Sequence, residues 1–127
     1  MKYLALIYTD ESRWDALSED ERSAIYARYR AFGDSARDKI LGGAELAPNA
    51  TATTVRIREG ETVVTDGPFV ETKEALGGFY VFDCDTIDEA LALAAQIPSA
   101  ETGAIEVRPG YVDAAAEQAE QSEEVVA

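Results

Sequence analysis

The stretch TDGPFVETKEALGGFYVFDC, residues 65–84, decides how this chain folds. Its last seven residues, 78–84, are rich in aromatic and apolar side chains, a composition that is typical of a buried strand. Its beginning, DGPF at 66–69, combines an aspartate that can bond nearby backbone, a glycine that tolerates a positive φ and a proline with a fixed φ. The stretch therefore predicts a tight turn followed by a strand of the central sheet.

The first third of the chain predicts one strand and one long helix. Residues 2–9, KYLALIYT, are mostly apolar and indicate a buried strand. Ser18 followed by Glu21 is a capping box, in which each side chain bonds the other residue's backbone at the start of a helix. Apolar residues then recur at steps of three and four as far as Ile40, so we expect one long helix that ends at the glycine pair 42–43.

Between this helix and the DGPF turn, the chain predicts a short strand and a hairpin. Residues 44–47 form the short strand, which Pro48 stops. In residues 53–58, Thr, Val and Ile alternate with Thr and Arg, and a second run, 61–65, returns after the pair EG. This alternation is typical of a β-hairpin with one polar face.

After the central strand, the chain predicts a second helix and a last strand. Thr86 followed by Glu89 forms a second capping box, ahead of an amphipathic helix that Pro98 stops. Residues 104–109, AIEVRP, form the last strand. Residues 113–127 are rich in Ala, Glu and Gln, so we expect one domain over 1–112 and a separate acidic tail.

The order of these elements predicts the fold. With the hairpin treated as an insertion, the order is βαββαβ, which is the split pattern of a ferredoxin-like α+β domain with both helices on one face of an antiparallel sheet. The strands carry apolar residues in both directions, so the other sheet face needs a cover as well. A second copy of the same sheet, related by a two-fold axis, is the simplest cover, and we therefore predict a homodimer.

The composition excludes several classes of function. A net charge of −14 repels phosphate backbones and anionic lipid surfaces, so we expect neither direct nucleic-acid binding nor membrane binding. Cys84 is the single cysteine, which leaves no partner for an intrachain disulfide, and its acidic neighbours predict an inert thiol. The N-terminal apolar run is too short for a signal peptide, so the predicted location is cytoplasmic.

The sequence contains no histidine. This removes the Ser-His and Cys-His nucleophile pairs, the imidazole general base and most transition-metal sites. Any catalysis must use carboxylates, lysine, tyrosine, arginine or Cys84. We accordingly predict no metal and no cofactor, because the acidic cluster of residues 83–89 resembles a metal site only in composition.

Four segments together carry a family resemblance: TATTVR, VTDGPFVETKEALGGFYVFD, DEALALAAQIP and AIEVRPG. With them, the chain resembles the YCII-related proteins of the DGPF-domain type from about residue 1 to residue 112. The DGPF motif alone is weak, and its specificity comes from the segments that follow it. The resemblance implies a ferredoxin-like fold and a dimeric α+β barrel, in agreement with the reading of the residues.

What the resemblance implies about function is narrower. Many DGPF-type members are encoded beside extracytoplasmic-function sigma factors, which implies an association with a sigma factor. Some relatives are suspected enzymes with a His-Asp pair in a cleft, and a few act on chlorinated aromatic breakdown products. Asp66 matches the aspartate of the motif, but the absence of histidine prevents that pair from being carried over.

The predicted site is built around the DGPF turn. The interpretation that we favour is a structural turn in which Phe69 packs into the core beneath. The other interpretation is catalytic: a carboxylate whose pKa is raised by burial can act as a general acid or base, and Asp66 is the predicted residue for this role at the mouth of a cleft. The predicted substrate-binding residues are Tyr8, Asp66, Gly67, Pro68, Phe69, Glu71 and Lys73.

Three functions stay open at this point. The first, which we favour, is small-molecule binding or sensing in the barrel cleft, linked to sigma-factor regulation. The second is a lyase or isomerase that uses Asp66 as acid and base on a small cyclic substrate. The third is a protein-interaction partner in transcription regulation, with the acidic surface steering it to a basic partner.

Overall fold

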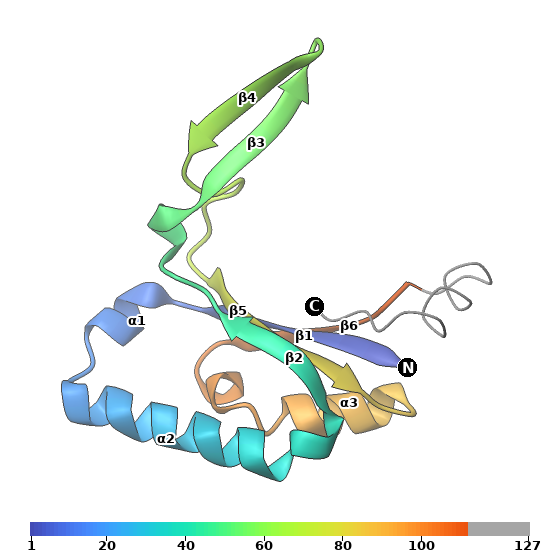
Figure 1. Ribbon diagram of the computed structural model, residues 1–127. Helices are drawn as coiled ribbons and strands as arrows, with labels where there is room; N and C mark the ends of the chain where they lie inside the picture. The colour runs from blue at the N-terminus through green and yellow to red at the C-terminus, as the bar shows by residue number, and fades with distance from the viewer. Residues whose placement is uncertain (112–127) are drawn as a thin grey trace.

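The computed structural model describes residues 1–111, and the predicted acidic tail, 113–127, lies outside them (Figure 1). The strands are β1 (Lys2–Thr9), β2 (Ile40–Glu45), β3 (Thr53–Arg58), β4 (Glu61–Asp66), β5 (Ala75–Asp83) and β6 (Ala104–Pro109). The α-helices are α1 (Glu11–Asp15), α2 (Glu19–Ser35) and α3 (Ile87–Ala94). Three short 3-10 helices complete the chain: η1 (Arg37–Lys39), η2 (Asn49–Thr51) and η3 (Pro98–Glu101).

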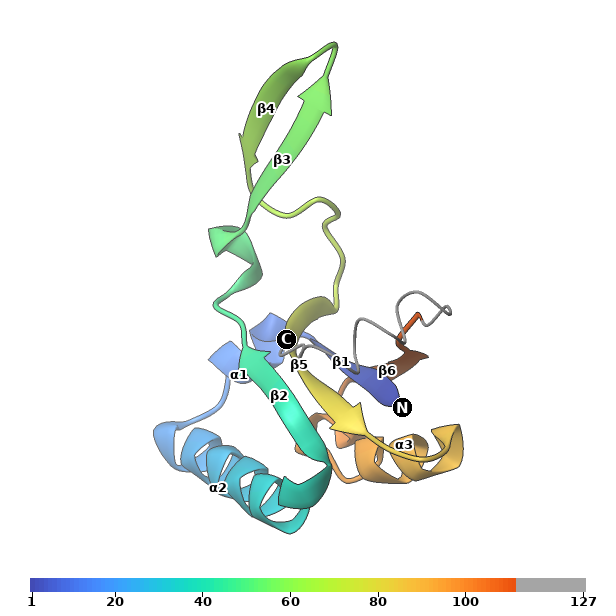
Figure 2. The ribbon, with the colours of Figure 1, turned by 45° about the vertical axis from the view of Figure 1, so that its right-hand side comes forward.

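Four strands form one antiparallel sheet in the order β2-β5-β1-β6. This order, with β3 and β4 set aside as an insertion, is that of a βαββαβ ferredoxin-like domain and confirms the predicted α+β fold. The helices α2 and α3 lie on one face of the sheet, as Figures 1 and 2 show from two directions. No helix among residues 1–111 is both long and apolar enough to cross a membrane.

The core lies between the sheet and these two helices. On β1 the buried residues alternate with part-exposed ones, so one face of the strand is buried against the helices. Phe32 of α2 packs edge-on against Tyr80 and Phe82 of β5, with ring centroids 5.3 Å and 6.3 Å apart. Phe82, Ile97 and Cys84 are the largest fully buried side chains, which makes the end of β5 the centre of the core.

The start of α2 confirms its predicted cap. The Ser18 hydroxyl accepts from the Glu21 backbone N–H at 3.1 Å, and the Glu21 carboxylate accepts from the Ser18 N–H at 3.0 Å. Both bonds satisfy backbone groups that a helix leaves unpaired at its first turn. These interactions use only residues close in sequence, which is why the sequence sufficed to locate this boundary.

The predicted end of this helix at the glycine pair 42–43 is wrong. The helix ends at Ser35, and residues 40–45 form strand β2 instead of the short strand predicted at 44–47. A Cβ on Gly43 would lie 2.5 Å from the carbonyl oxygen of Phe79, so this residue must be glycine for β2 to approach β5. The glycines therefore serve a contact between strands and not a helix cap.

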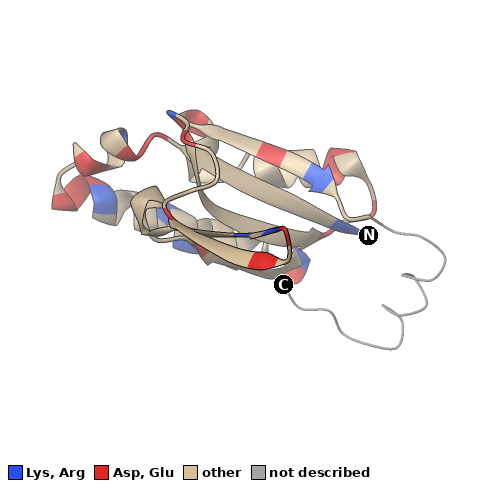
Figure 3. Ribbon diagram, turned by 90° about the horizontal axis from the view of Figure 1, so that it is seen from above, with Lys and Arg blue, Asp and Glu red and all other residues tan. Residues whose placement is uncertain are grey.

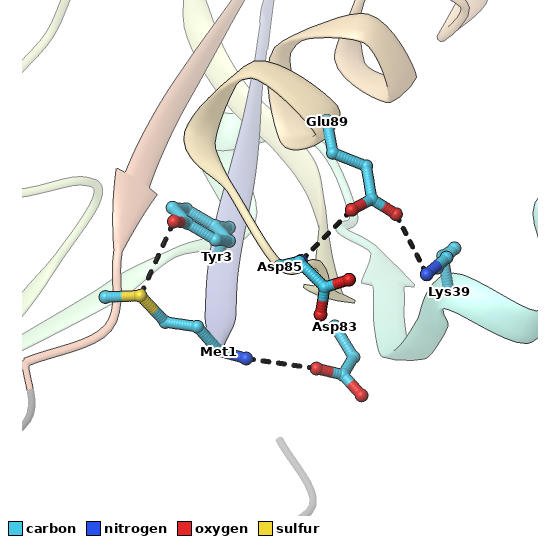
Figure 4. A network of polar contacts seen from close by, with 6 residues as sticks. All are labelled: Met1, Tyr3, Lys39, Asp83, Asp85 and Glu89. Atoms are coloured by element: carbon cyan, nitrogen blue, oxygen red, sulfur yellow. Dashed lines mark hydrogen bonds and ion pairs between the residues drawn. The ribbon is translucent and has the colours of Figure 1, made fainter.

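The start of α3 belongs to a polar network (Figure 4). The Thr86 hydroxyl accepts from the Glu89 N–H at 3.2 Å, as predicted, but the Glu89 carboxylate accepts from the Asp85 N–H and not from Thr86. Its other oxygen lies 2.8 Å from the Lys39 ammonium. The network thus joins the end of η1, just before β2, to the start of α3, and the bond with Lys39 lowers the pKa of Glu89.

The insertion is a two-stranded hairpin that stands away from the rest of the domain. We call residues 53–66, which are strands β3 and β4 and their turn, the arm. Its two-residue turn has Glu59 at φ 52° and Gly60 at φ 78°, the pair of positive angles that a tight hairpin turn requires. In Figures 1 and 2 the arm projects on the side of the sheet opposite α2 and α3.

Candidate functional site

A cavity of about 610 Å³ lies at one end of the sheet, on the side of the helices. Its volume falls within the range of roughly 300–1,000 Å³ that is usual for small-molecule sites. The walls come from α1, the first half of α2, the adjoining ends of β2 and β5, and η3. The aromatic side chains that line it from the helix side are Trp14, Tyr26, Tyr29 and Tyr80. Phe79 is also a lining residue, but it pairs with Leu6 and its side chain lies on the other face of the sheet.

Two glycines of the sheet lie at the wall of the cavity. Gly43 and Gly78 belong to the paired strands β2 and β5, and a Cβ on Gly43 would lie 2.5 Å from the Phe79 carbonyl oxygen. A Cβ on Gly78 would lie 2.9 Å from the Ala44 carbonyl oxygen, so close pairing of the strands requires glycine there too. The two glycines therefore allow β2 and β5 to pair closely where they form the cavity wall.

Tyr26 and Glu45 form a polar pair at the cavity. The Tyr26 hydroxyl donates to the Glu45 carboxylate at 2.8 Å, which ties α2 to the end of β2. This bond raises the pKa of Tyr26, because the neutral phenol is the form that donates to the carboxylate. Trp14 packs edge-on against the Tyr26 ring with centroids 5.4 Å apart, and this contact places α1 at the cavity wall.

Two further tyrosines contribute hydroxyl groups to the walls. The Tyr29 hydroxyl lies 2.5 Å from the Ser99 hydroxyl, a bond that joins α2 to η3. Burial raises the pKa of Tyr29 and of Tyr80, so both are neutral phenols at physiological pH. With Tyr26, they give an apolar cavity a small number of groups that can donate or accept a hydrogen bond.

Opposite charges meet around the cavity. Arg28 binds Glu101 through both guanidinium nitrogens, at 2.8 Å and 2.9 Å, so these two charges neutralise each other. Arg13 donates to the Thr102 carbonyl oxygen at 3.3 Å, from α1 to the loop after η3. Asp10 caps α1 through Ser12, and this bond lowers its pKa.

The charges of the lining as a whole are mostly negative. Two arginines face five acidic residues, which are Asp10, Glu11, Asp15, Glu45 and Glu101. Asp and Glu also predominate where α1 and the start of α2 lie, at the left in Figure 3. The Asn49 N–H donates to both Glu11 carboxylate oxygens, at 3.0 Å and 3.1 Å, which fixes α1 to the segment leading to the arm.

The DGPF turn lies at the base of the arm and not at this cavity. Asp66 is the last residue of β4 and is exposed. Gly67 has φ 103°, as its predicted role in a turn requires, and its N–H donates to the Ala52 carbonyl oxygen at 2.7 Å. The Thr54 hydroxyl donates to the Gly67 carbonyl oxygen at 2.9 Å, so the turn closes the base of the arm.

The predicted packing of Phe69 into the core is wrong. Its side chain is 71% exposed, and the Arg56 guanidinium of the arm lies 4.9 Å from the ring centroid. The reason is the position of the turn, which follows the arm and lies outside the layers that enclose the core. Phe69 therefore packs against β3 and leaves the core to Phe82.

The other predicted site residues are dispersed. Tyr8 pairs with Leu76 and Ala104 across the sheet, on the face away from the helices. Glu71 and Lys73 are exposed in the segment between the arm and β5, and Pro68 is half-buried. The pKa of Asp10 is lowered mainly by its bonds with Ser12, and the positive charge of Lys73 lowers it further. Lys73 therefore interacts electrostatically with a residue of the cavity lining.

Sequence reasoning missed the residues that line the cavity. Residues 10–17 carry the single tryptophan of the chain, which is a signal that this acidic segment is more than a connection. Tyr29 belongs to the apolar stripe predicted for the first helix and was assigned to the core. Tyr26 and Glu45 are far apart in sequence, and no local pattern indicates that they pair.

Among residues 1–111, no group of three or more Cys, Asp or Glu side chains is gathered closely enough to hold a metal ion. Tyr26 bonds Glu45, Tyr29 bonds Ser99 and Arg28 bonds Glu101 at the cavity. What the cavity offers is therefore aromatic surface, three phenols and an acidic rim, a combination suited to binding a small molecule.

Sheet order and helix placement put the chain in the class of ferredoxin-like α+β proteins. Within this class the chain belongs to the family of the YCII-related domain, whose model matches residues 1–111. The resemblance drawn from the DGPF segment and its neighbours is thereby confirmed.

Two individual proteins are similar to this chain. An uncharacterised protein of Rhizobium meliloti (strain 1021) is 46% identical over 118 residues, which cover 86% of this chain and 91% of that protein. A 5-chloro-2-hydroxyhydroquinone dehydrochlorinase (TftG) from Burkholderia phenoliruptrix, solved in complex with 2,5-dihydroxybenzoquinone, has a TM-score of 0.51 and 17% identity. This likeness covers 87% of this chain and 94% of the enzyme, and it shows the shared fold.

Proposed function

We propose that this protein binds a small molecule in the cavity between α1, α2 and the sheet. The observation that carries the proposal is a hollow of about 610 Å³ in a domain of this size, with aromatic walls and polar groups from three elements. A solid core with no hollow would have removed the binding hypothesis. The proposal keeps the small-molecule function predicted from the sequence and relocates its site to the helix side of the sheet.

The lining also favours a class of ligand. Aromatic side chains contact flat apolar rings well, and the neutral hydroxyl groups of Tyr26 and Tyr29 supply hydrogen bonds to a polar substituent. The acidic residues around the cavity disfavour an anion and attract a cation. We therefore propose a small ring compound that is neutral or positively charged.

The finer parts of the sequence reading stay proposals. We propose a homodimer, in which a second copy covers the sheet face that lacks helices. A cytoplasmic location, a sensing role and an association with a sigma factor are supported by the composition and by the family resemblance alone. The enzyme alternative is supported by the same resemblance, but Asp66 is exposed, whereas a carboxylate that acts as acid and base needs shielding from water.

The experiment compares three ring compounds of similar size but different charge: phenol, benzoate and benzylamine. Ligand-observed NMR at millimolar concentration is expected to detect phenol and benzylamine and to show weaker binding of benzoate. Tyr26→Phe removes the hydroxyl that bonds Glu45 and is expected to weaken phenol binding severalfold.

The matched control is Tyr111→Phe, which removes the same hydroxyl from a side chain that is 85% exposed. This variant is expected to bind like the wild type. Absence of binding by all three compounds, or equal binding by Tyr26→Phe and the wild type, would count against the cavity as the site.

A further inference from the structure

One face of the arm is aliphatic and bare. Val55 pairs with Val64 across the hairpin, and Ile57 follows two residues after Val55, so the three side chains share a face. They are 60%, 61% and 59% exposed, respectively. Apolar side chains in adjacent positions on one surface, all exposed to this degree, are typical of a surface that another molecule covers.

The opposite face of the arm is partly covered by the chain's own DGPF segment. Arg56 and Val63 pair with each other there, and Arg56 extends over the Phe69 ring at 4.9 Å. Val63 is 42% exposed, less than the three residues of the bare face. The chain thus folds its own DGPF segment against one face of the arm and leaves the other without a described contact.

The arm has little support from the rest of the domain. Among residues 1–111, β3 and β4 form a sheet with each other and with no further strand, and the contacts of Gly67 with Ala52 and Thr54 lie at the base of the arm. A two-stranded hairpin alone is marginally stable in water, and three strands or a packed face are needed for an independent fold. A hairpin of this length therefore needs a packed surface for its aliphatic face.

We propose that the bare face of the arm packs on a second copy of this chain. The arm projects on the side of the sheet without α2 and α3, next to the face that carries the part-exposed side chains of Leu4, Leu6 and Phe79 (Figures 1 and 2). A two-fold axis would place each arm beside the other copy's sheet, so one contact would cover both surfaces. This inference rests on the homodimer proposed above.

The charges of the arm suit this partner. The whole chain carries −14, so two copies repel each other in general. The arm, residues 53–66, carries two arginines, Arg56 and Arg58, against three acids, Glu59, Glu61 and Asp66, which leaves a net charge of −1. The arm therefore adds little to the repulsion between two acidic copies, and a basic partner protein would gain little attraction from so small a charge.

The exposed apolar area of the arm and the sheet face is comparable with that of a standard protein interface. The three aliphatic side chains of the bare face and the part-exposed side chains of the helix-free sheet face together offer on the order of a few hundred Å² of apolar surface per copy. A standard interface buries about 800 Å² per partner, of which somewhat more than half is apolar. The arm and the sheet face together can meet that requirement, whereas neither suffices alone.

The proposed arm contact would place Asp66 at the interface between the two copies. Asp66 pairs with Thr53 and lies on the same face of the arm as Val55 and Val64. An arm that packs on a second copy brings its Asp66 carboxylate to that copy's surface. Any site that uses the DGPF turn is then shared between two subunits, and it is complete only in the dimer.

The test measures the association of purified full-length chain by sedimentation velocity from about 1 to 100 μM. The variant V55T/I57T/V64T keeps β-branched residues and removes the apolar surface of the bare face. Its dimer dissociation constant is expected to rise at least tenfold over that of the wild type. The matched control V63T makes the same kind of change on the covered face and is expected to change the constant less than threefold.

Each outcome bears on the proposal. A wild type that is monomeric at 100 μM would overturn both the homodimer and the arm contact. A dimeric wild type whose triple variant associates equally well would overturn the arm contact alone. An equal loss in V63T would assign the effect to arm folding and overturn it too. Hydrogen exchange of the backbone amides of residues 53–66 in the wild type is a second test. The proposal requires these amides to exchange more slowly as the protein concentration rises and the dimer forms.

Discussion

The body of the domain and its arm are built from the same kind of strand, but they differ in what buries their apolar side chains. In the body, Ala5 and Phe82 of neighbouring strands are completely buried beneath the helices. In the arm, Val55 and Val64 pair across the hairpin just as regularly and stay about 60% exposed. The comparison teaches that strand pairing determines the shape of both regions, whereas stability comes from the layer that covers them.

The largest difference is expected from truncation of one apolar side chain in each region. Phe82→Ala empties the centre of the core and is expected to lower the free energy of unfolding by about 3–5 kcal/mol. Ile57→Ala removes a side chain that is 59% exposed and is expected to cost less than about 1 kcal/mol in dilute protein. Urea unfolding followed by Trp14 fluorescence measures the free energy of unfolding of both variants. Equal losses in the two would contradict the distinction between a covered body and an uncovered arm.

A second test compares two glycines of the body. Gly43→Ala forces a Cβ to within 2.5 Å of the Phe79 carbonyl oxygen, and we expect a loss of about 1–3 kcal/mol as β2 shifts away from β5. Gly33→Ala in α2 meets no atom within 4 Å, and we expect a gain of roughly 0.5–1 kcal/mol from higher helix propensity. Chemical unfolding of both variants provides the check, and a gain in Gly43→Ala would mean that the strands do not approach so closely.

The third test is confined to the arm. Gly60→Ala places a side chain at φ 78° in the hairpin turn and is expected to cost the arm about 1 kcal/mol. Glu59→Asn, at φ 52°, is expected to act in the opposite direction, because asparagine tolerates this conformation. Hydrogen exchange of the arm amides should report both changes while the urea midpoint of the body stays constant, and a shift of that midpoint would show that the two regions unfold together.

The smallest effect concerns pH. The bond with Lys39 lowers the pKa of Glu89 below its ordinary value of 4.5. The stability that this carboxylate contributes is therefore complete above pH 4.5 and is lost as the pH falls through the lower folded value. The effect is small because both side chains are partly solvated, with 43% of Lys39 and 32% of Glu89 exposed.

The corresponding variant is Glu89→Gln. We expect the difference in urea midpoint between wild type and variant to shrink as the pH is lowered from 6 to 3. A difference that stays constant over this range would attribute the loss to packing and not to the charge.

The parts of the fold that follow from neighbouring residues could be predicted from the sequence. The Ser18 capping box and the hairpin depend on contacts within a few residues, and the structure contains both. The last strand is also present as predicted, although it pairs with β1 at the start of the chain. The glycine pair 42–43 shows the limit of such reasoning. Glycine suits the end of a helix as well as a close approach of two strands, and only the pairing of β2 with β5 decides between them.

The site was less predictable for the same reason. The DGPF motif indicates a turn and the family, but its sequence does not show that the turn lies at the base of an arm. The cavity is lined by Gly43 and Gly78 of paired strands and by Tyr26, which bonds Glu45 from 19 residues away. These are tertiary contacts, which no period or local motif encodes.

The buried position of Cys84 has a practical consequence. Its side chain is 1% exposed, and burial raises the pKa of its thiol, so a thiol reagent reaches it only when the body opens. Because the sequence has no other cysteine, the rate at which the reagent modifies the protein measures the rate at which the body opens. A cysteine introduced at the tip of the arm would react at once. The fast reaction would then report the exposed arm and the slow reaction of Cys84 the opening of the body, both in one sample.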